Sequence, residues 1–98
     1  MEYIMNKNTL NLGPRLDFES HRSFRDQLTK ALHGKPQTLC IDMSAVEFMD
    51  SSGMGMLLLA NQEALQQDCK VELLRPHGQV RDIIELAHID RVMKVIYD

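Results

Sequence analysis

The sequence lacks the features that direct a chain into a membrane or onto nucleic acid. No apolar run approaches the roughly 20 residues that a membrane-spanning helix requires, and residues 1–7 lack the pattern of a signal peptide. No cluster of lysine and arginine stands out in a chain whose formal net charge is −3. We therefore expect a cytoplasmic protein that inserts into no membrane and binds no nucleic acid.

Cysteine and histidine are present without the spacings of redox or metal sites. Cys40 and Cys69 form no CxxC pair, and each lies within or beside an apolar run. This usage favours buried thiols in a reducing compartment over a disulfide. The four histidines share no metal-ligand spacing on a helix face, so we expect no metal site.

Motifs of the common enzyme classes are also missing. The run Gly53-Met54-Gly55 is too short for a Walker or dinucleotide-binding loop. Ser51 and Ser52 lack the G-x-S-x-G context of a hydrolase nucleophile and have no histidine near them in sequence. We expect a protein that is not an enzyme and carries no cofactor, with a catalytic triad assembled only in space as the open alternative.

Hydrophobic periodicity and chain breakers predict alternating strands and helices. Short β-prone segments at 2–6 and 9–12 indicate an edge hairpin. The first helix, which ends at the breaker 34–36 and is capped by Asp17 or Ser20, has an apolar stripe formed by Phe24, Leu28, Ala31 and Leu32. The other expected strands are 38–43, 70–74 and 92–97, and the other expected helices are 51–67 and 80–87.

This order, approximately β-β-α-β-α-β-α-β, indicates an α/β fold with a mostly parallel or mixed sheet. The length of 98 residues suits one domain, 1–98. In helix 51–67, Met54 and Leu58 share a face, while Met56 makes the first half apolar on a further side. Such a helix is either buried between neighbours or partly offered to a partner.

The start of helix 51–67 carries the residues with most chemical content. Asp50 precedes Ser51 and Ser52, and two glycines follow. Asp or Ser at a helix start can accept hydrogen bonds from the free amides of the first turn, and the same amides favour a phosphate. Ser51 is therefore a helix cap, a phosphate-bearing switch, or both.

The segment 48–55 closely resembles the Asp-Ser-Ser-Gly-x-Gly motif of the bacterial anti-sigma factor antagonists, which are single STAS domains of partner-switching cascades. Leu16-Asp17, the strand 39–43, the segment 80–84 and the ending 92–97 also fit this family. The resemblance implies a STAS-like small mixed β-sheet backed by about three α-helices on one face.

The resemblance also implies a function and a site. Ser51 would be the phosphoacceptor, with Ser52 as the competing acceptor. The unphosphorylated form would bind and sequester an anti-sigma factor that is also a serine kinase of the ATPase-fold switch-kinase type. Phosphorylation would abolish this binding and a serine phosphatase would restore it. The expected partner-binding residues of this monomer are Asp17, Asp50, Ser51, Ser52, Gly53, Met54 and Gly55.

Two other functions stay open. The apolar face around 54–58 equally suits a structural STAS subunit of a lipid- or anion-transport assembly. Nucleotide binding, which is reported for some STAS domains, has little support because no loop suits a triphosphate.

Overall fold

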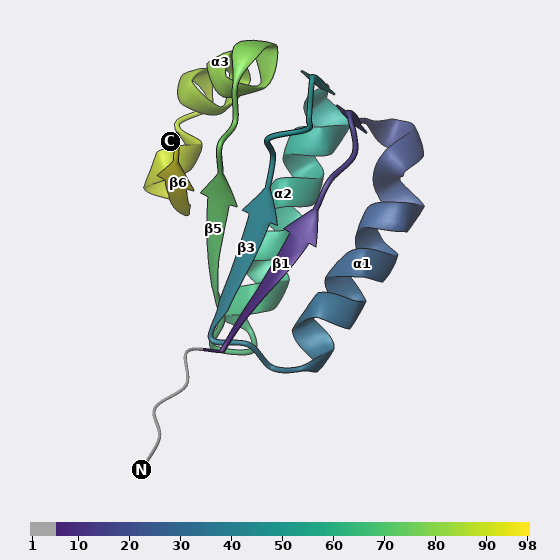
Figure 1. Ribbon diagram of the computed structural model, residues 1–98, viewed down its shortest axis with the longest axis vertical. Helices are drawn as coiled ribbons and strands as arrows, with labels where there is room; N and C mark the ends of the chain where they lie inside the picture. Colours follow the sequence, from purple (N-terminus) through teal and green to yellow (C-terminus); the bar gives the residue numbers. More distant parts are fainter. Residues whose placement is uncertain (1–5) are drawn as a thin grey trace.

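Strands and helices alternate through the computed structural model, which describes residues 6–98 (Figure 1). The strands are β1 (Lys7–Asn11), β2 (Arg15–Leu16), β3 (Thr38–Asp42), β4 (Phe48–Met49), β5 (Lys70–Leu74) and β6 (Lys94–Ile96). The helices are α1 (His21–His33), α2 (Ser51–Leu65) and α3 (Gly78–Leu86), and the short 3-10 helices are η1 (Phe18–Ser20) and η2 (Ile89–Arg91). The α/β class predicted from the sequence is confirmed.

The main sheet has the strand order β1-β3-β5-β6, and β2 and β4 form a separate two-stranded pair. Every strand pairing among residues 6–98 is parallel, so the described sheet is not mixed. The reason lies in the connections, since α1, α2 and α3 each return the chain to the starting end of the main sheet.

The predicted N-terminal hairpin is wrong where it can be compared. Its turn was expected around residues 6–8, but Lys7–Asn11 is one continuous strand that pairs with β3. The other arm of that hairpin, 2–6, lies outside the described residues except for Asn6. The polar residues that favoured a turn are tolerated because β1 is the outer strand of the sheet formed by residues 6–98. Its Asn8 side chain donates to the carbonyl of Ala31 at 2.7 Å.

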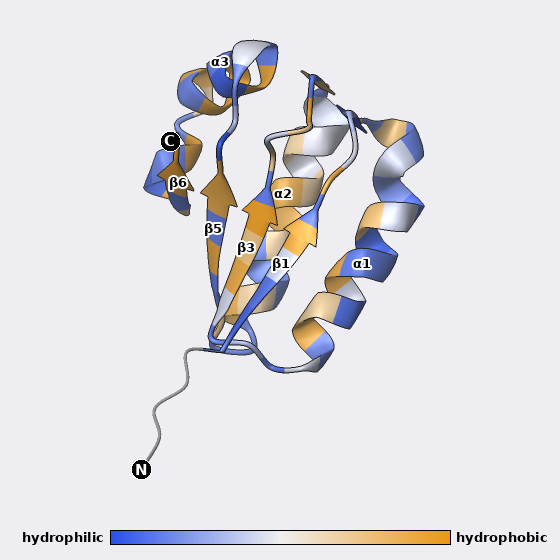
Figure 2. Ribbon diagram, viewed as in Figure 1, coloured by the Kyte–Doolittle hydropathy of each residue, from blue (hydrophilic) through white to orange (hydrophobic). Residues whose placement is uncertain are grey.

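Helices α1 and α2 cover one face of the sheet, whereas α3 lies across its carboxyl end (Figure 1). The register places Leu10, Ile41 and Leu73 in one row, and all three are buried. Figure 2 shows that β3 and β5 are largely apolar while apolar and hydrophilic stretches alternate along α1. The core thus lies mainly between the sheet and the helices α1 and α2. Val80 and Ile84 of α3 also belong to it, and α3 contacts β4 and η2.

Most predicted boundaries agree with the structure, but the first cap differs. Asp17 begins η1 rather than α1, and its amide donates to Ser20 Oγ at 3.2 Å while that hydroxyl donates to Asp17 Oδ1 at 3.1 Å. Ser20 directly precedes α1 but makes no side-chain bond to its first turn. The chain therefore enters α1 through an extra tight turn that the apolar pattern alone does not reveal.

Side chains tie the loops together at the carboxyl end of the sheet. Asp42, at the end of β3, accepts the amide of Ser44 at 2.9 Å and the guanidinium of Arg75 at 2.8 Å. His77 Nε2 lies 2.9 Å from the carbonyl oxygen of Ser44. The Ser44 amide, together with Arg75, holds the pKa of Asp42 below its ordinary value of 3.8.

Helix α2 packs on β2 at a glycine. Gly53 is buried, and a Cβ atom there would overlap the carbonyl oxygen of Leu16 and lie 2.7 Å from Met49 Cγ. Gly55, two residues later, is exposed and has nothing within 4 Å of the corresponding position. One glycine is thus required by packing and the other is not.

These two glycines predict opposite effects of the same substitution. Gly53→Ala should lower the free energy of unfolding by about 2–3 kcal/mol, because α2 must move away from a backbone carbonyl. Gly55→Ala should raise it by about 0.5–1 kcal/mol, because alanine is the better helix former and nothing obstructs it. Urea denaturation of the two variants measures both, and equal effects would contradict this account of the packing.

Asp42 predicts a pH-dependent contribution to stability. Its folded-state pKa is lowered, so its stabilising effect is present above the unfolded-state pKa, about 4, and is lost as the pH falls toward the folded-state pKa. Asp42→Asn should therefore destabilise the protein at pH 7, with the difference from wild type shrinking below about pH 4. Denaturation curves between pH 7 and pH 3 test this, with the exposed Asp26→Asn as control. A pH-independent difference would be the contrary result.

Candidate functional site

The amino-terminal end of α2 is capped by Asp50. Its backbone is extended (φ −111°, ψ −171°), and its Oδ1 atom accepts the amide of Gly53 at 2.9 Å. Its carbonyl oxygen accepts the amide of Met54 at 3.1 Å, which begins the helical hydrogen-bond pattern. Since Asp50 holds the capping position, the hydroxyl of Ser51 is not needed there.

The two serines follow as the first residues of the helix. Ser51 is exposed and Ser52 is half-buried, and neither hydroxyl makes a hydrogen bond within residues 6–98. Their backbone amides belong to the first turn, where an α-helix offers no acceptor of its own. An exposed hydroxyl therefore stands beside free amides and the positive end of the helix dipole, a setting that favours a phosphate group.

The next three residues differ in exposure. Gly53, which we expected among the partner-binding residues, is buried against Leu16 of its own chain. Met54 is half-buried and packs against the core, and Gly55 is exposed. Of the two glycines in the motif, Gly55 alone leaves open space above the helix surface.

The β2–β4 pair brings Asp17 to the same end of the molecule. Leu16 pairs with Met49, so the residues that follow them, Asp17 and Asp50, lie at the same end of two parallel strands. Asp50 donates its amide to the carbonyl of Leu16 at 3.4 Å, which ties the two segments together. The Nε atom of Arg15 donates to Asp17 Oδ2 at 3.0 Å, and this bond lowers the pKa of Asp17.

Gln79 is a structural contributor that the sequence did not single out. Its Oε1 atom accepts the amide of Met49 at 3.1 Å, and its Nε2 atom donates to the carbonyl of Met49 at 2.9 Å. Helix α3 thereby holds the residue that directly precedes Asp50. No sequence signal could have found this role, since Gln79 recognises a backbone segment 30 residues away.

Phe18 is a second residue that sequence reasoning missed. It is 75 % exposed on η1, directly after Asp17, and η1 contacts α2. Nearby, the guanidinium carbon of Arg15 lies 4.5 Å from the centroid of the Phe48 ring. An apolar residue in a short turn offers no periodicity, so its exposure could not be read from the sequence.

The sequence also led to expectations about the cysteines, membrane-spanning segments and metal sites. Cys40 and Cys69 are buried free thiols, as predicted, and burial raises the pKa of both. Within residues 6–98, no helix is long and apolar enough to cross a membrane. In the same part of the chain, no cluster of three or more histidine, cysteine or acidic side chains could hold a metal ion.

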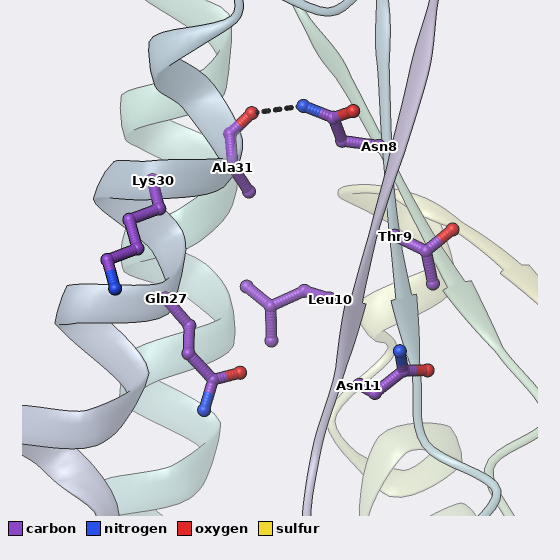
Figure 3. Close-up of a pocket in the computed structure, with 7 residues that line it drawn as sticks. All are labelled: Asn8, Thr9, Leu10, Asn11, Gln27, Lys30 and Ala31. Atoms are coloured by element: carbon purple, nitrogen blue, oxygen red, sulfur yellow. Dashed lines mark hydrogen bonds between the residues drawn. The ribbon is translucent and has the colours of Figure 1, made fainter.

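A hollow between β1 and α1 lies on other elements than those that hold Ser51 (Figure 3). Asn8, Thr9, Leu10 and Asn11 line it from β1, and Gln27, Lys30 and Ala31 line it from α1. The amide of Asn8 is already bonded to the carbonyl of Ala31. We therefore place the candidate site at the start of α2 rather than in this hollow.

Comparison with known proteins gives a family match over most of the chain. The family model described as "Mlab, STAS domain" matches residues 5–96. A STAS-domain containing protein of Pseudomonas aeruginosa is 28 % identical over 87 residues, which cover 89 % of this chain and 85 % of the relative. The anti-sigma-F factor antagonist RsfB of Mycobacterium tuberculosis is 27 % identical over 86 residues, which cover 88 % of this chain and 70 % of RsfB.

Solved structures show the same fold. An anti-sigma factor antagonist from Mycobacterium paratuberculosis matches with a TM-score of 0.84 at 18 % identity, over 99 % of this chain and 82 % of that chain. A sulfate transporter family protein from Wolinella succinogenes matches with a TM-score of 0.82 at 11 % identity, over 99 % and 81 %. Bacillus SpoIIAA in its phosphorylated form matches with a TM-score of 0.69 at 22 % identity, over 97 % and 86 %.

The Asp-Ser-Ser-Gly-x-Gly motif lies at the start of α2, within the residues that the family model matches. This chain belongs to the STAS domain family, and its relatives include anti-sigma factor antagonists.

Proposed function

We propose that this chain is an anti-sigma factor antagonist whose binding is switched at Ser51. The observation that carries the proposal is the exposed Ser51 hydroxyl, which Asp50 releases from the capping role. The relative RsfB is described as an anti-sigma-F factor antagonist, and a protein of the same fold, SpoIIAA, is known in a phosphorylated form. Both support the proposal.

A phosphate on Ser51 changes the isolated fold little. It adds about −1.5 to −2 charges at neutral pH. The free amides and the helix dipole stabilise such a group by roughly 0.3–1 kcal/mol, while the neighbouring Asp50 carboxylate repels it. Because these effects oppose each other, α2 should keep its position on β2.

The same phosphate acts strongly on a bound partner. A partner that covers Ser51 must bury the dianion without a counter-charge, which is unfavourable by several kcal/mol. A loss of roughly 3–4 kcal/mol weakens binding about 100- to 1000-fold. The switch therefore works by blocking the complex rather than by refolding the domain.

The proposed contact surface surrounds Ser51. Asp17, Asp50 and Ser52 supply polar groups, and the half-buried Met54 supplies apolar contact beside the open surface at Gly55. Gly53 supports this surface from below by letting α2 approach Leu16.

The chain itself performs no chemistry in this proposal. The partner is an anti-sigma factor that also acts as a serine kinase of the ATPase-fold type, and it transfers a phosphoryl group to Ser51 Oγ. A separate serine phosphatase hydrolyses the phosphate and restores binding. The chain contributes the acceptor hydroxyl and the surface that both enzymes recognise.

A structural role in a transport assembly is the second candidate. The matching family description names Mlab, and a sulfate transporter family protein shares the fold. In that case the face of α2 around Met54 and Leu58 would be covered permanently, and Ser51 would stay unmodified. The two functions differ in whether a negative charge at Ser51 disrupts the complex.

Substitution at Ser51 tests the switch. Ser51→Ala should keep binding on, and Ser51→Asp should weaken it at least tenfold, since the added carboxylate must be buried beside Asp50. Ser23→Asp, an exposed serine on α1, controls for charge alone. Affinity capture from a lysate of the native host, read by quantitative mass spectrometry, should enrich a small kinase-like ATPase on the alanine bait and lose it from the Ser51→Asp bait.

Two outcomes would revise this function. Equal capture of the same transport subunits on both Ser51 baits would favour the structural role. Phosphosite mapping of native material that located phosphate only on Ser52 would move the acceptor by one residue.

A further inference from the structure

The side of α2 that faces β6 is unusually apolar for a free surface. Five large apolar side chains are exposed among residues 6–98, and three of them, Leu58, Leu65 and Val92, lie on α2 or just before β6. Leu65 and Val92 border a hollow of about 200 Å³ whose walls also include Val71 and Met93. Clustered exposed apolar residues of this kind mark interaction surfaces more often than isolated ones do.

Asn61 of α2 carries a side-chain amide at this hollow. Asn61 lines it and is only 8 % exposed; its side chain makes no hydrogen bond within the described part of the chain, and its amide atoms are not fully enclosed. The Asn61 amide can both donate and accept, so it is suited to a peptide group placed over the hollow, much as Gln79 binds the peptide groups of Met49.

The charge at the hollow favours an acidic occupant. Lys70 and Lys94 line it and are exposed, and neither forms an ion pair with any of residues 6–98. Glu72 also lines it, but its Oε1 atom accepts from Cys40 Sγ at 3.8 Å. Lys94 lies opposite Glu72 in the β5–β6 register, and the two ammonium groups outnumber this one carboxylate at the hollow.

The hollow and the switch residue share one face of α2. Ser51, Gly55, Leu58 and Leu65 follow at intervals of three, four or seven residues, which places them along one side of the helix. At about 1.5 Å per residue, Ser51 and Leu65 lie about 21 Å apart. A stable protein complex buries about 800 Å² on each partner, or about 20–30 residues, and a partner that lies lengthwise along this face covers both Ser51 and the hollow.

We propose that the protein that binds the unphosphorylated Ser51 surface makes a second contact here. An aliphatic side chain of that partner enters the hollow, its peptide group bonds to Asn61, and an adjacent carboxylate pairs with Lys70 or Lys94. This inference rests on the proposed function, because the partner is the same protein. The second contact is too far from Ser51 to meet the phosphate, so it sets how tightly the unphosphorylated form binds.

The test uses the protein that Ser51→Ala captures and Ser51→Asp does not, purified and titrated calorimetrically. In the Ser51→Ala background, Leu65→Ser combined with Val92→Ser should raise the Kd at least tenfold. Leu86→Ser, which removes an 80 % exposed leucine on α3, should leave the Kd unchanged. All four side chains changed here are exposed, so the fold should persist, and denaturation curves verify this.

A charge variant adds an independent measurement. Lys70→Glu combined with Lys94→Glu should weaken binding and reduce its dependence on salt, while Lys30→Glu, on exposed α1 surface, should change neither. An unchanged Kd in both double variants, with Ser51→Asp still blocking the complex, would overturn the second contact and leave the switch intact. If no protein distinguishes the two Ser51 variants, the proposed function fails and this inference fails with it.

Discussion

The close approach of α2 to β2 at Gly53 is the constraint on which the rest of the site depends. The carbonyl oxygen of Leu16 occupies the space that any side chain at residue 53 would need. This contact sets where the first turn of α2 stands, and therefore where Ser51 meets solvent. It also brings the β2–η1 segment, with Asp17, beside a motif more than thirty positions later in the chain.

In the first turn of α2, Asp50 caps the helix and the neighbouring Ser51 offers a free hydroxyl. Asp50 satisfies the amide of Gly53, so the helix start is stable whether or not Ser51 is modified. Ser51 keeps a free hydroxyl beside amides that have no acceptor. A domain that must hold one fold through a change of two charges benefits from this separation, because the group that changes is not the group that caps.

The fold was largely predictable from the sequence because its signals are local. Val71 and Leu73 face the core along β5, and the breaker after His33 ends α1 where it was expected. The position of α3 was not predictable, since it depends on Gln79 reaching the backbone of Met49 and on His77 reaching Ser44. The path of β1 was misjudged because an edge strand tolerates asparagines that a turn would also favour.

The features of the candidate site also fall into two groups: those that follow from the local sequence and those that depend on tertiary packing. The sequence by itself determined that Asp50, Ser51 and Ser52 lie at the start of a helix that follows a strand, because breakers and periodicity act over a few residues. Only the tertiary structure decided that Asp50 is the cap, that Gly53 packs closely against Leu16, and that Asn61 lines a hollow. These depend on which distant segments fill the space around each residue, and that is set by the folded chain as a whole.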